Sequence, residues 1–305
     1  MSDVKFGISV VADSPDIADL ESLGFDSMWV GSHLSEPSGE YDGMVQLARL
    51  TAMTHRLEIG VSAIALPLYQ PAVIAKQLLD LDVLSGGRVR LGIGIGGEHP
   101  EEFRAVNVPI SERGARTNEA LELIRKFWPG DEVTHHGRFY DVDNVRLLTR
   151  QPPVHRNGPP IIVAGRKSAA MRRAVAFGDG WFPYLYSPER YQRSVEEIRR
   201  YADEAGRDLA GFEWCVLLFT RLGTDADEAR QMLASQLGQG FQSGQDFGPL
   251  IDRVAVAGTL TDVIEKVQKF IDAGARHIHF SFHGDRRLEQ AEQLVEEVLP
   301  RVGVR

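Results

Sequence analysis

Residues 57–95 read LEIGVSAIALPLYQPAVIAKQLLDLDVLSGGRVRLGIGI and place two short apolar runs on either side of a longer amphipathic stretch. The runs 57–64 and 89–95 are rich in branched side chains, as strands are. The stretch 71–84 starts with a proline and repeats apolar residues at helical spacing. A strand, a helix and a second strand in that order form a βαβ unit with two parallel strands. This part of the chain therefore predicts an α/β fold.

The same alternation extends over the rest of the chain. Strands are predicted at residues 5–11, 27–30, 57–64, 89–95, 161–163, 180–184, 213–220 and 277–282. Helices are predicted at residues 15–23, 45–54, 71–84, 111–128, 168–177, 188–205, from 225 onward, 261–273 and 288–299. Insertions interrupt the rhythm after the fourth strand, at 130–160 with a hairpin at 136–140, and after the seventh strand, at 238–249. Eight strands joined by helices favour a closed (β/α)8 TIM barrel that uses residues 1–305 as one domain.

The composition is typical of a soluble globular protein and argues against two classes of partner. The chain has 305 residues, of which 43% are hydrophobic and 25% charged, and its net charge is −9. No global positive field therefore recruits nucleic acid or an anionic membrane. The single cysteine, Cys215, excludes an intrachain disulfide, and the longest apolar stretch, 61–66, is too short to span a membrane. The N-terminus lacks a signal peptide's apolar segment, so we expect a cytoplasmic protein.

Five segments, in chain order, resemble the bacterial luciferase-like oxidoreductases, a family of flavin monooxygenases and deazaflavin (coenzyme F420) oxidoreductases. They are residues 23–33, 81–94, 112–116, 178–181 and 257–259, which read LGFDSMWVGSH, LDVLSGGRVRLGIG, ERGAR, GDGW and AGT. The resemblance implies a barrel, a homodimer, a small organic substrate and a flavin-type cofactor. Coenzyme F420 is the first expectation for that cofactor and FMN the second. The alternatives to F420-dependent hydride transfer are an FMNH2-dependent monooxygenase and a non-catalytic flavin-binding relative.

Two residues are candidates for acid–base catalysis at the barrel's active-site rim, where the strands end. His33 directly follows the second strand, and the resemblance implies that it lies beside the cofactor ring and the substrate. Imidazole titrates near neutral pH, so His33 can move a proton while the cofactor moves a hydride. Glu98 and His99 follow the fourth strand, and Glu98 is the second candidate. Ser32 stands where many deazaflavin enzymes resembling this chain carry an aspartate. The alternative for each candidate is an ordinary solvated loop residue.

The ends of the third and fourth strands are candidates for cofactor contact. Gly94, Ile95, Gly96 and Gly97 form a glycine-rich strand end that lets a cofactor approach the backbone closely. Ile95 matches the position of an arginine that reaches the FMN phosphate in luciferases. The resemblance also implies a cis peptide bond between Ser62 and Ala63, backing the deazaflavin ring. The alternative is a regular strand that ends with two small core residues.

The fifth strand is followed by a candidate phosphate site. Gly165, Arg166, Lys167 and Ser168 combine two cations, a hydroxyl and the start of a helix, whose free N–H groups and dipole favour an anion. The F420 phosphate, and the acidic polyglutamate tail beyond it, suit this loop. The alternative is a solvated basic loop with Ser168 as a simple N-cap.

His277 and His279 are two residues apart, so they share one face of the eighth strand, as zinc ligands would. Strands four, five and six end in residues that are poor ligands, so we expect no metal and a histidine pair that faces the helical layer. The sequence also lacks the paired carboxylates or metal ligands that a barrel hydrolase needs.

Overall fold

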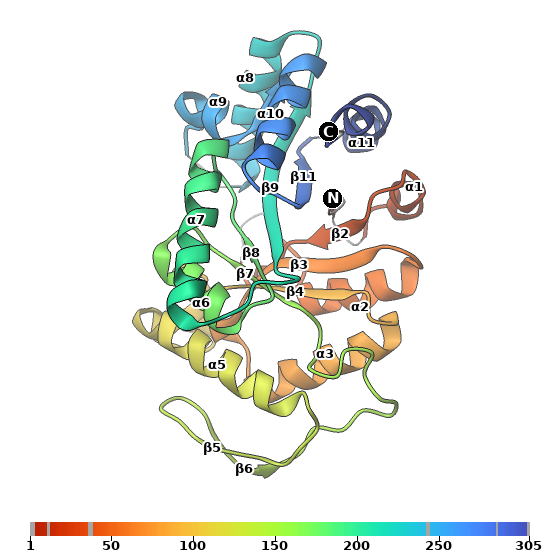
Figure 1. Ribbon diagram of the computed structural model, residues 1–305. Helices are drawn as coiled ribbons and strands as arrows, with labels where there is room; N and C mark the ends of the chain where they lie inside the picture. The colour runs from red at the N-terminus through yellow and green to blue at the C-terminus, as the bar shows by residue number, and fades with distance from the viewer. Residues whose placement is uncertain (1–3, 11–12, 36–38, 242–244, 285, 304–305) are drawn as a thin grey trace.

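A computed structural model describes residues 4–10, 13–35, 39–241, 245–284 and 286–303. Its main sheet contains eight parallel barrel strands (Figure 1). They are β1 (Lys5–Val10), β2 (Ser27–Val30), β3 (Glu58–Ala65), β4 (Val89–Gly94), β7 (Ile161–Ala164), β8 (Gly180–Phe182), β9 (Glu213–Leu222) and β11 (His277–Phe282). They pair in the order β9-β11-β1-β2-β3-β4-β7-β8, and a further β8–β9 pairing closes the barrel. The predicted TIM barrel is confirmed.

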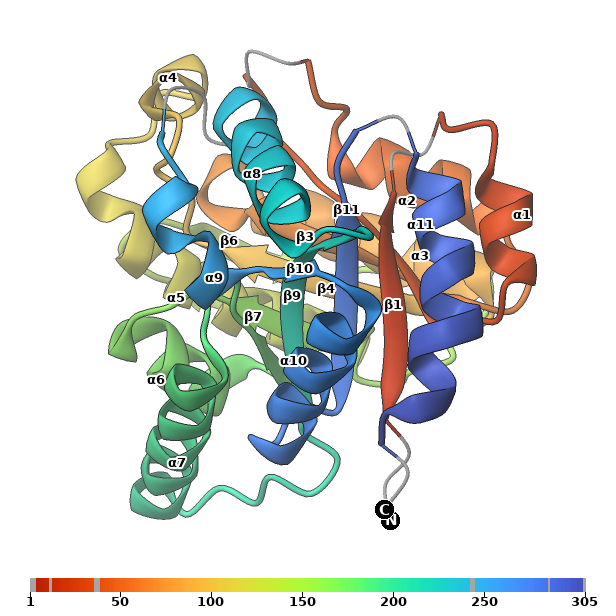
Figure 2. The same cartoon turned by 90° about the horizontal axis from the view of Figure 1, so that it is seen from above.

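Helices cover the outside of the barrel, and in Figure 2 they surround β1, β11 and β9. Those predicted from the sequence are α1 (Ile17–Ser22), α2 (Gly43–Met53), α3 (Pro71–Ser85), α5 (Arg113–Phe127), α6 (Ser168–Phe177), α7 (Pro188–Ala205), α8 (Ala226–Gln236), α10 (Leu260–Asp272) and α11 (Arg287–Gln293). Local chemistry sets their ends: the Ser187 side chain accepts a hydrogen bond from the Arg190 N–H before α7, and Thr259 and Asp262 form a capping box at α10. Among the described residues, no helix is both long and apolar enough to cross a membrane.

Among the α-helices and strands of the described residues, three short elements were not predicted from the sequence. They are the helices α4 (Pro100–Ala105) and α9 (Ile251–Val254) and the strand β10 (Val256–Gly258), which pairs with the end of β9. Each spans less than two helical turns or only three strand residues, which is too short for a periodic pattern. The insertion after β4 contains the predicted hairpin, formed by β5 (Val133–His136) and β6 (Asp141–Val145), which projects beyond α5 in Figure 1.

Two predicted segments extend outside the described residues, namely the end of the first strand at residue 11 and part of the insertion, 242–244. The predicted closing helix at 288–299 is α11 followed by a π-helical turn, Leu294–Val298, and a 3-10 turn, Leu299–Arg301. The other predicted elements differ from the observed ones at their ends by a few residues.

The middle of the barrel interior is filled by stacked rings. The ring of His279 lies 4.3 Å from that of Trp29 and 4.6 Å from that of Phe182, measured between centroids. All three side chains are buried. A Cβ at Gly60 would lie 2.3 Å from the Trp29 ring, so only glycine fits opposite this indole. The layer separates the two ends of the barrel.

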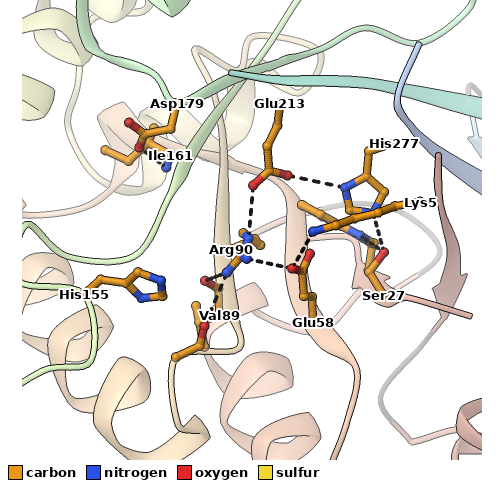
Figure 3. A network of polar contacts seen from close by, with 12 residues as sticks. Lys5, Ser27, Glu58, Val89, Arg90, His155, Ile161, Asp179, Glu213 and His277 are labelled. Carbon is orange, nitrogen blue, oxygen red and sulfur yellow. Dashed lines mark hydrogen bonds and ion pairs between the residues drawn. The ribbon is translucent and has the colours of Figure 1, made fainter. Parts of the chain in front are cut away.

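A charged network fills the end of the barrel where the strands begin (Figure 3). The Arg90 guanidinium on β4 donates to Glu58 on β3 at 2.7 Å and to Glu213 on β9 at 3.2 Å. Lys5 on β1 donates to Glu58 at 2.8 Å, and Glu213 lies 3.4 Å from Nδ1 of His277 on β11. Burial alone raises the pKa of Glu213, but the hydrogen bond from His277 and the charge of Arg90 outweigh it and lower that pKa. The network therefore joins five strands.

The histidine pair of β11 faces the barrel interior, so the expectation that it faces the helical layer was wrong. Ser27 Oγ accepts from Trp29 Nε1 at 2.9 Å and lies within hydrogen-bond distance of His277 Nε2, at 2.8 Å. The alternate residues of the strand, Ile278 and Phe280, point to the opposite face and belong to the main apolar core. The period of two predicted that both histidines share a face; the apolar neighbours decided which face.

The histidines do have a third potential ligand nearby, which the sequence analysis missed. Cys215 on β9 lies with His277 and His279, and one ligand atom from each falls within 4.8 Å of the others. Burial raises the pKa of the Cys215 thiol and lowers the pKa of His279, so both side chains favour their neutral forms. Three side chains do not complete the four ligands of a closed structural zinc site, and we assign no metal to this cluster.

Replacing Arg90 tests the charged network. Arg90→Met leaves Glu58 and Glu213 without their shared cation, so the free energy of unfolding at pH 7 should fall by about 3 kcal/mol. Because Glu213 has a lowered pKa in the folded protein, its contribution is present above a pH of about 4.3 and is lost as the pH falls further. The difference between the two proteins should therefore shrink in acid.

Urea denaturation monitored by circular dichroism at several pH values measures this difference. The matched control is Arg200→Met, because Arg200 is an exposed residue paired with Glu204 on α7. We expect the control to keep the wild-type midpoint. Equal midpoints for Arg90→Met and wild type would show that the network does not stabilise the barrel.

Candidate active site

A cavity of about 590 Å³ opens at the mouth of the barrel, where the strands end. Its lining includes three of the residues predicted from the sequence, His33, Ser62 and Ala63. The other lining residues are Ser9, Val10, Asp13, Gly31, Ser32, Gly39, Glu40, Tyr41, Leu217, Phe219, Ser281, Phe282, His283, Gly284 and Arg287. The mixture of apolar and polar groups is that of a small-molecule site on this fold.

His33 is held by a buried carboxylate from α4. Its Nδ1 lies 3.2 Å from Oε1 of Glu102, whose side chain is 2% exposed. The same oxygen accepts from the backbone N–H groups of Leu34, at 2.8 Å, and Ser35, at 3.2 Å. A carboxylate only accepts hydrogen bonds, so the proton of neutral His33 lies on Nδ1 and the lone pair on Nε2. Glu102 was missed because nothing in the sequence distinguishes it from the adjacent Glu101.

The second predicted acid–base residue, Glu98, does not join His33 in the cavity. Glu98 is exposed and accepts a hydrogen bond of 2.5 Å from the Tyr184 hydroxyl. Burial and this carboxylate together raise the pKa of Tyr184. His99 instead approaches His33, with ring centroids 4.9 Å apart and an interplanar angle of 80°. The rim therefore contains two neighbouring imidazoles, and Glu98 lies outside the cavity lining.

The peptide bond between Ser62 and Ala63 is cis, which confirms that prediction. It coincides with a shift in the register of β3 against β4, which occurs at residues Val61 to Ile64 of β3. Gly94, on the neighbouring strand, has open space in front of it, because a Cβ there would find its nearest atoms 3.9 Å away. Ile95, Gly96 and Gly97 continue past the strand and, like Gly94, are not among the residues that line the mouth cavity.

Ser32 supports local structure at the cavity wall. Its side chain is buried, and its Oγ accepts a hydrogen bond of 3.0 Å from the Gly43 N–H at the start of α2. This serine therefore satisfies the first N–H group of α2. Asp42 accepts from the next two N–H groups of that helix.

The predicted phosphate loop lies in a different cavity, of about 610 Å³, which Arg166, Lys167 and Ser168 line. Lys167, and not Ser168, occupies the N-cap position of α6, and no side chain caps this helix. Gly165 has a φ of +140°, and a Cβ on it would lie 2.6 Å from Ala170 in the first turn of α6. The loop can therefore approach the helix closely only because residue 165 is glycine.

Four further polar residues line the mouth cavity, namely Asp13, Glu40, His283 and Arg287. Asp13 accepts from the Tyr41 hydroxyl at 2.9 Å, and Glu40 lies beside Gly31. Arg287 donates to Asp16 at 2.8 Å, so its charge is already balanced. Burial lowers the pKa of His283, which keeps this imidazole neutral at pH 7. Asp13 follows β1, Glu40 follows β2, and both His283 and Arg287 follow β11, so the four residues come from three separate parts of the chain.

Comparisons with known proteins agree with this geometry. The family model for luciferase-like monooxygenases matches residues 17–277. The F420-dependent glucose-6-phosphate dehydrogenase of Nakamurella multipartita is 26% identical over 338 residues, which cover 98% of this chain and 96% of that protein. An uncharacterized protein of Mycobacterium tuberculosis is 37% identical over 163 residues, 53% of this chain and 54% of the relative, so that match spans about half of the relative's length.

Solved structures share the fold over nearly the whole chain. An F420-dependent secondary alcohol dehydrogenase in complex with an F420-acetone adduct has a TM-score of 0.84 at 20% identity, covering 98% of this chain and 99% of that one. The oxygenating constituent of 3,6-diketocamphane monooxygenase from Pseudomonas putida, in complex with FMN, has a TM-score of 0.78 at 19% identity, covering 98% of each chain. At these sequence identities, the structural similarity shows only that the fold is shared.

Removing Glu102 should change the tautomer of His33. In Glu102→Ala, Nδ1 loses its acceptor, so neutral His33 should shift towards the Nε2–H form that unconstrained imidazole prefers. Nitrogen-15 NMR of histidine-labelled protein distinguishes the two forms. Turnover should fall about ten- to hundredfold, the effect known for groups that orient a ligating imidazole.

Glu101→Ala is the control, because Glu101 is 40% exposed and lies near His99 rather than His33. It should keep the Nδ1–H tautomer of His33. An unchanged His33 spectrum in Glu102→Ala would mean that another group sets the tautomer.

Proposed function

The chain belongs to the luciferase-like monooxygenase family, and on that premise we propose that it is an oxidoreductase that passes a hydride between coenzyme F420 and a small organic substrate. Relatives named F420-dependent glucose-6-phosphate dehydrogenase support the choice of cofactor, since their similarity extends over 92–98% of the chain. The observation that carries the proposal is the cavity at the barrel mouth. His33, oriented by Glu102, lines this cavity together with Ser62 and Ala63, where we place the cofactor ring.

The residues at the end of β3 and β4 fit a flat tricyclic ring. Ser62 and Ala63 present only small side chains to the cavity, and among the described residues no side-chain atom lies within 4 Å of where a Cβ on Gly94 would be. A ring placed there has backbone on one side and the substrate volume on the other. We propose that these residues and the glycine-rich segment 94–97 hold the ring.

The start of α6 fits a phosphate. Its first N–H groups have no side-chain cap, and Arg166 and Lys167 precede the helix directly. Neither cation forms an ion pair with the described part of the chain. A phosphate at this point would gain the helix N-terminus and two charges together. We propose that Gly165, Arg166, Lys167 and Ser168 bind it.

His33 supplies the proton chemistry of the proposed reaction. When bound, a deazaflavin would supply hydride transfer to or from the substrate carbon that is reduced or oxidised. In the direction of oxidation, Nε2 of His33 accepts the proton of the substrate hydroxyl, while Glu102 stabilises the cationic ring through Nδ1. In the direction of reduction, Nε2 returns the proton to the carbonyl oxygen. Glu98 accepts a hydrogen bond from Tyr184 outside the mouth cavity, so we do not include it in the proposed proton transfer.

The second candidate is an FMNH2-dependent monooxygenase. FMN also ends in a phosphate, which the same loop suits, and a structural neighbour contains FMN. Ile95 counts against it, because this position provides no cation. A single charge-assisted hydrogen bond is worth about 1.5–3 kcal/mol, so its loss weakens an FMN-type site.

Replacing His33 tests its role. His33→Ala should lower turnover by about 10²- to 10⁴-fold, because the proton loses its acceptor. The affinity for the cofactor should change far less, since the phosphate loop is untouched. Steady-state kinetics and fluorescence titration measure the two quantities. The control is His136→Ala in the surface hairpin, where the side chain is 68% exposed. Wild-type turnover in His33→Ala would assign His33 to the loop structure alone.

A side-by-side titration with F420 and FMN tests the cofactor. We expect tighter binding of F420, and a loss of about ten- to hundredfold in the Arg166→Ala, Lys167→Ala double variant. The control is Arg172→Ala, on the same helix but 58% exposed and close to Glu204. Tighter binding of FMN would favour the monooxygenase, and unchanged F420 affinity in the double variant would place the phosphate elsewhere.

A further inference from the structure

The cavity at the start of α6 extends well beyond the phosphate loop. It has a volume of about 610 Å³ and reaches onto the first turns of α7, which packs beside α6 (Figure 1). Its lining residues are Arg166, Lys167, Ser168, Met171, Tyr186, Arg190, Arg193, Ser194 and Glu197. A single phosphate would occupy only a part of this volume.

The cavity carries uncompensated positive charge. Four of its lining residues are basic, two before α6 and two on α7, whereas Glu197 is the single acidic one. Within the part of the chain that the structure describes, none of the four forms an ion pair. This is unusual in a chain with a net charge of −9, in which Arg90, Arg116 and Arg230 are all paired with carboxylates. The missing counter-charge points to an anionic ligand.

Two of the arginines are held in place by aromatic rings. The Arg166 guanidinium lies 4.6 Å from the centre of the Tyr184 ring, and that of Arg190 lies 4.1 Å from the Tyr186 ring. Arg190 and the Tyr186 hydroxyl both donate to the Arg166 carbonyl, at 3.2 and 3.1 Å. The two segments of the cavity are thus joined before any ligand arrives, which lowers the entropic cost of binding.

The spacing on α7 favours an extended anion. Arg190 and Arg193 are three residues apart, so they lie on one face of the helix, about 5 Å apart along its axis. The proposed phosphate contacts, Arg166 and Lys167, use neither of them. A ligand that reaches all four cations must therefore continue past the phosphate with further negative groups. Carboxylates repeated along a flexible chain have this property.

We propose that the face of α7 formed by Arg190 and Arg193 binds the acidic, oligoglutamate-like tail of the cofactor beyond its phosphate. This inference rests on the proposed function, because FMN ends at its phosphate and cannot use the α7 arginines. This face of α7 would therefore favour F420 over FMN by binding the tail. It lies outside the barrel mouth and makes no contact with the reacting ring. The attraction is between partly exposed charges, so salt screens it.

The test compares F420 carrying its oligoglutamate tail with the same deazaflavin truncated after the phosphate-linked lactate, by fluorescence titration of the full chain. We expect the tailed form to bind about tenfold more tightly at low salt, and the advantage to disappear at high salt. In the Arg190→Gln, Arg193→Gln double variant this advantage should be lost, with a larger loss for the tailed form than for the truncated one, because Arg190 also donates to the Arg166 carbonyl of the phosphate loop.

Three further variants make the result specific. Arg193→Gln alone removes a charge that has no ion-pair partner in the described chain, so it should lose part of the advantage without disturbing the loop. Glu197→Gln removes the acidic lining residue and should strengthen binding of the tailed form. The Arg199→Gln, Arg200→Gln control changes two exposed arginines of α7 outside the cavity and should retain the wild-type difference.

The outcomes distinguish a failure of the tail site on α7 from a failure of F420 as the proposed cofactor. Equal affinity of the wild type for tailed and truncated F420 would overturn the tail site and leave the cofactor unchanged. An equal loss for both forms in the double variant would also overturn it, because the arginines would then act on the phosphate loop. If FMN binds and neither form of F420 does, the proposed cofactor is wrong and the tail site falls with it.

Discussion

The Arg90 guanidinium, held between Glu58 and Glu213 inside the barrel, is the interaction on which the rest of the structure depends. Two carboxylates enclosed by strands need a shared cation, since each loses most of its hydration there. Through Lys5 and His277 the same network reaches two more strands. It therefore fixes how β1, β3, β4, β9 and β11 start relative to one another. The positions of their other ends, where the active site lies, follow from that register.

The barrel interior is divided into layers with different chemistry. The charged network occupies the end where the strands begin, and the rings of Trp29, Phe182 and His279 occupy the middle. Since both layers are filled by side chains, the open volume is left at the mouth. The neutral, buried His279 belongs to packing, whereas His33 at the mouth is 30% exposed and available to a substrate. The same residue type thus serves two purposes at the two depths.

Binding and proton transfer are assigned to separate parts of the rim. The mouth cavity contains the oriented His33 and the cis peptide between Ser62 and Ala63, whereas the basic cavity lies between α6 and α7. Under the proposed function, an anchor outside the barrel would let the cofactor gain affinity without filling the substrate volume. Loops at the mouth can then vary with the substrate, while the anchor remains on two helices.

The sequence by itself determined the alternation of strands and helices, the position of His33 after the second strand and, through family resemblance, the cis peptide. These features depend on local spacing, which a single chain displays. Only the tertiary structure decided that Glu102 pairs with His33, that Glu98 meets Tyr184 and that His277 and His279 face inward. Glu102 lies 69 residues from His33, and Tyr184 lies 86 residues from Glu98. A period of two identifies residues that share a face, but closure of the barrel decides which face becomes the interior.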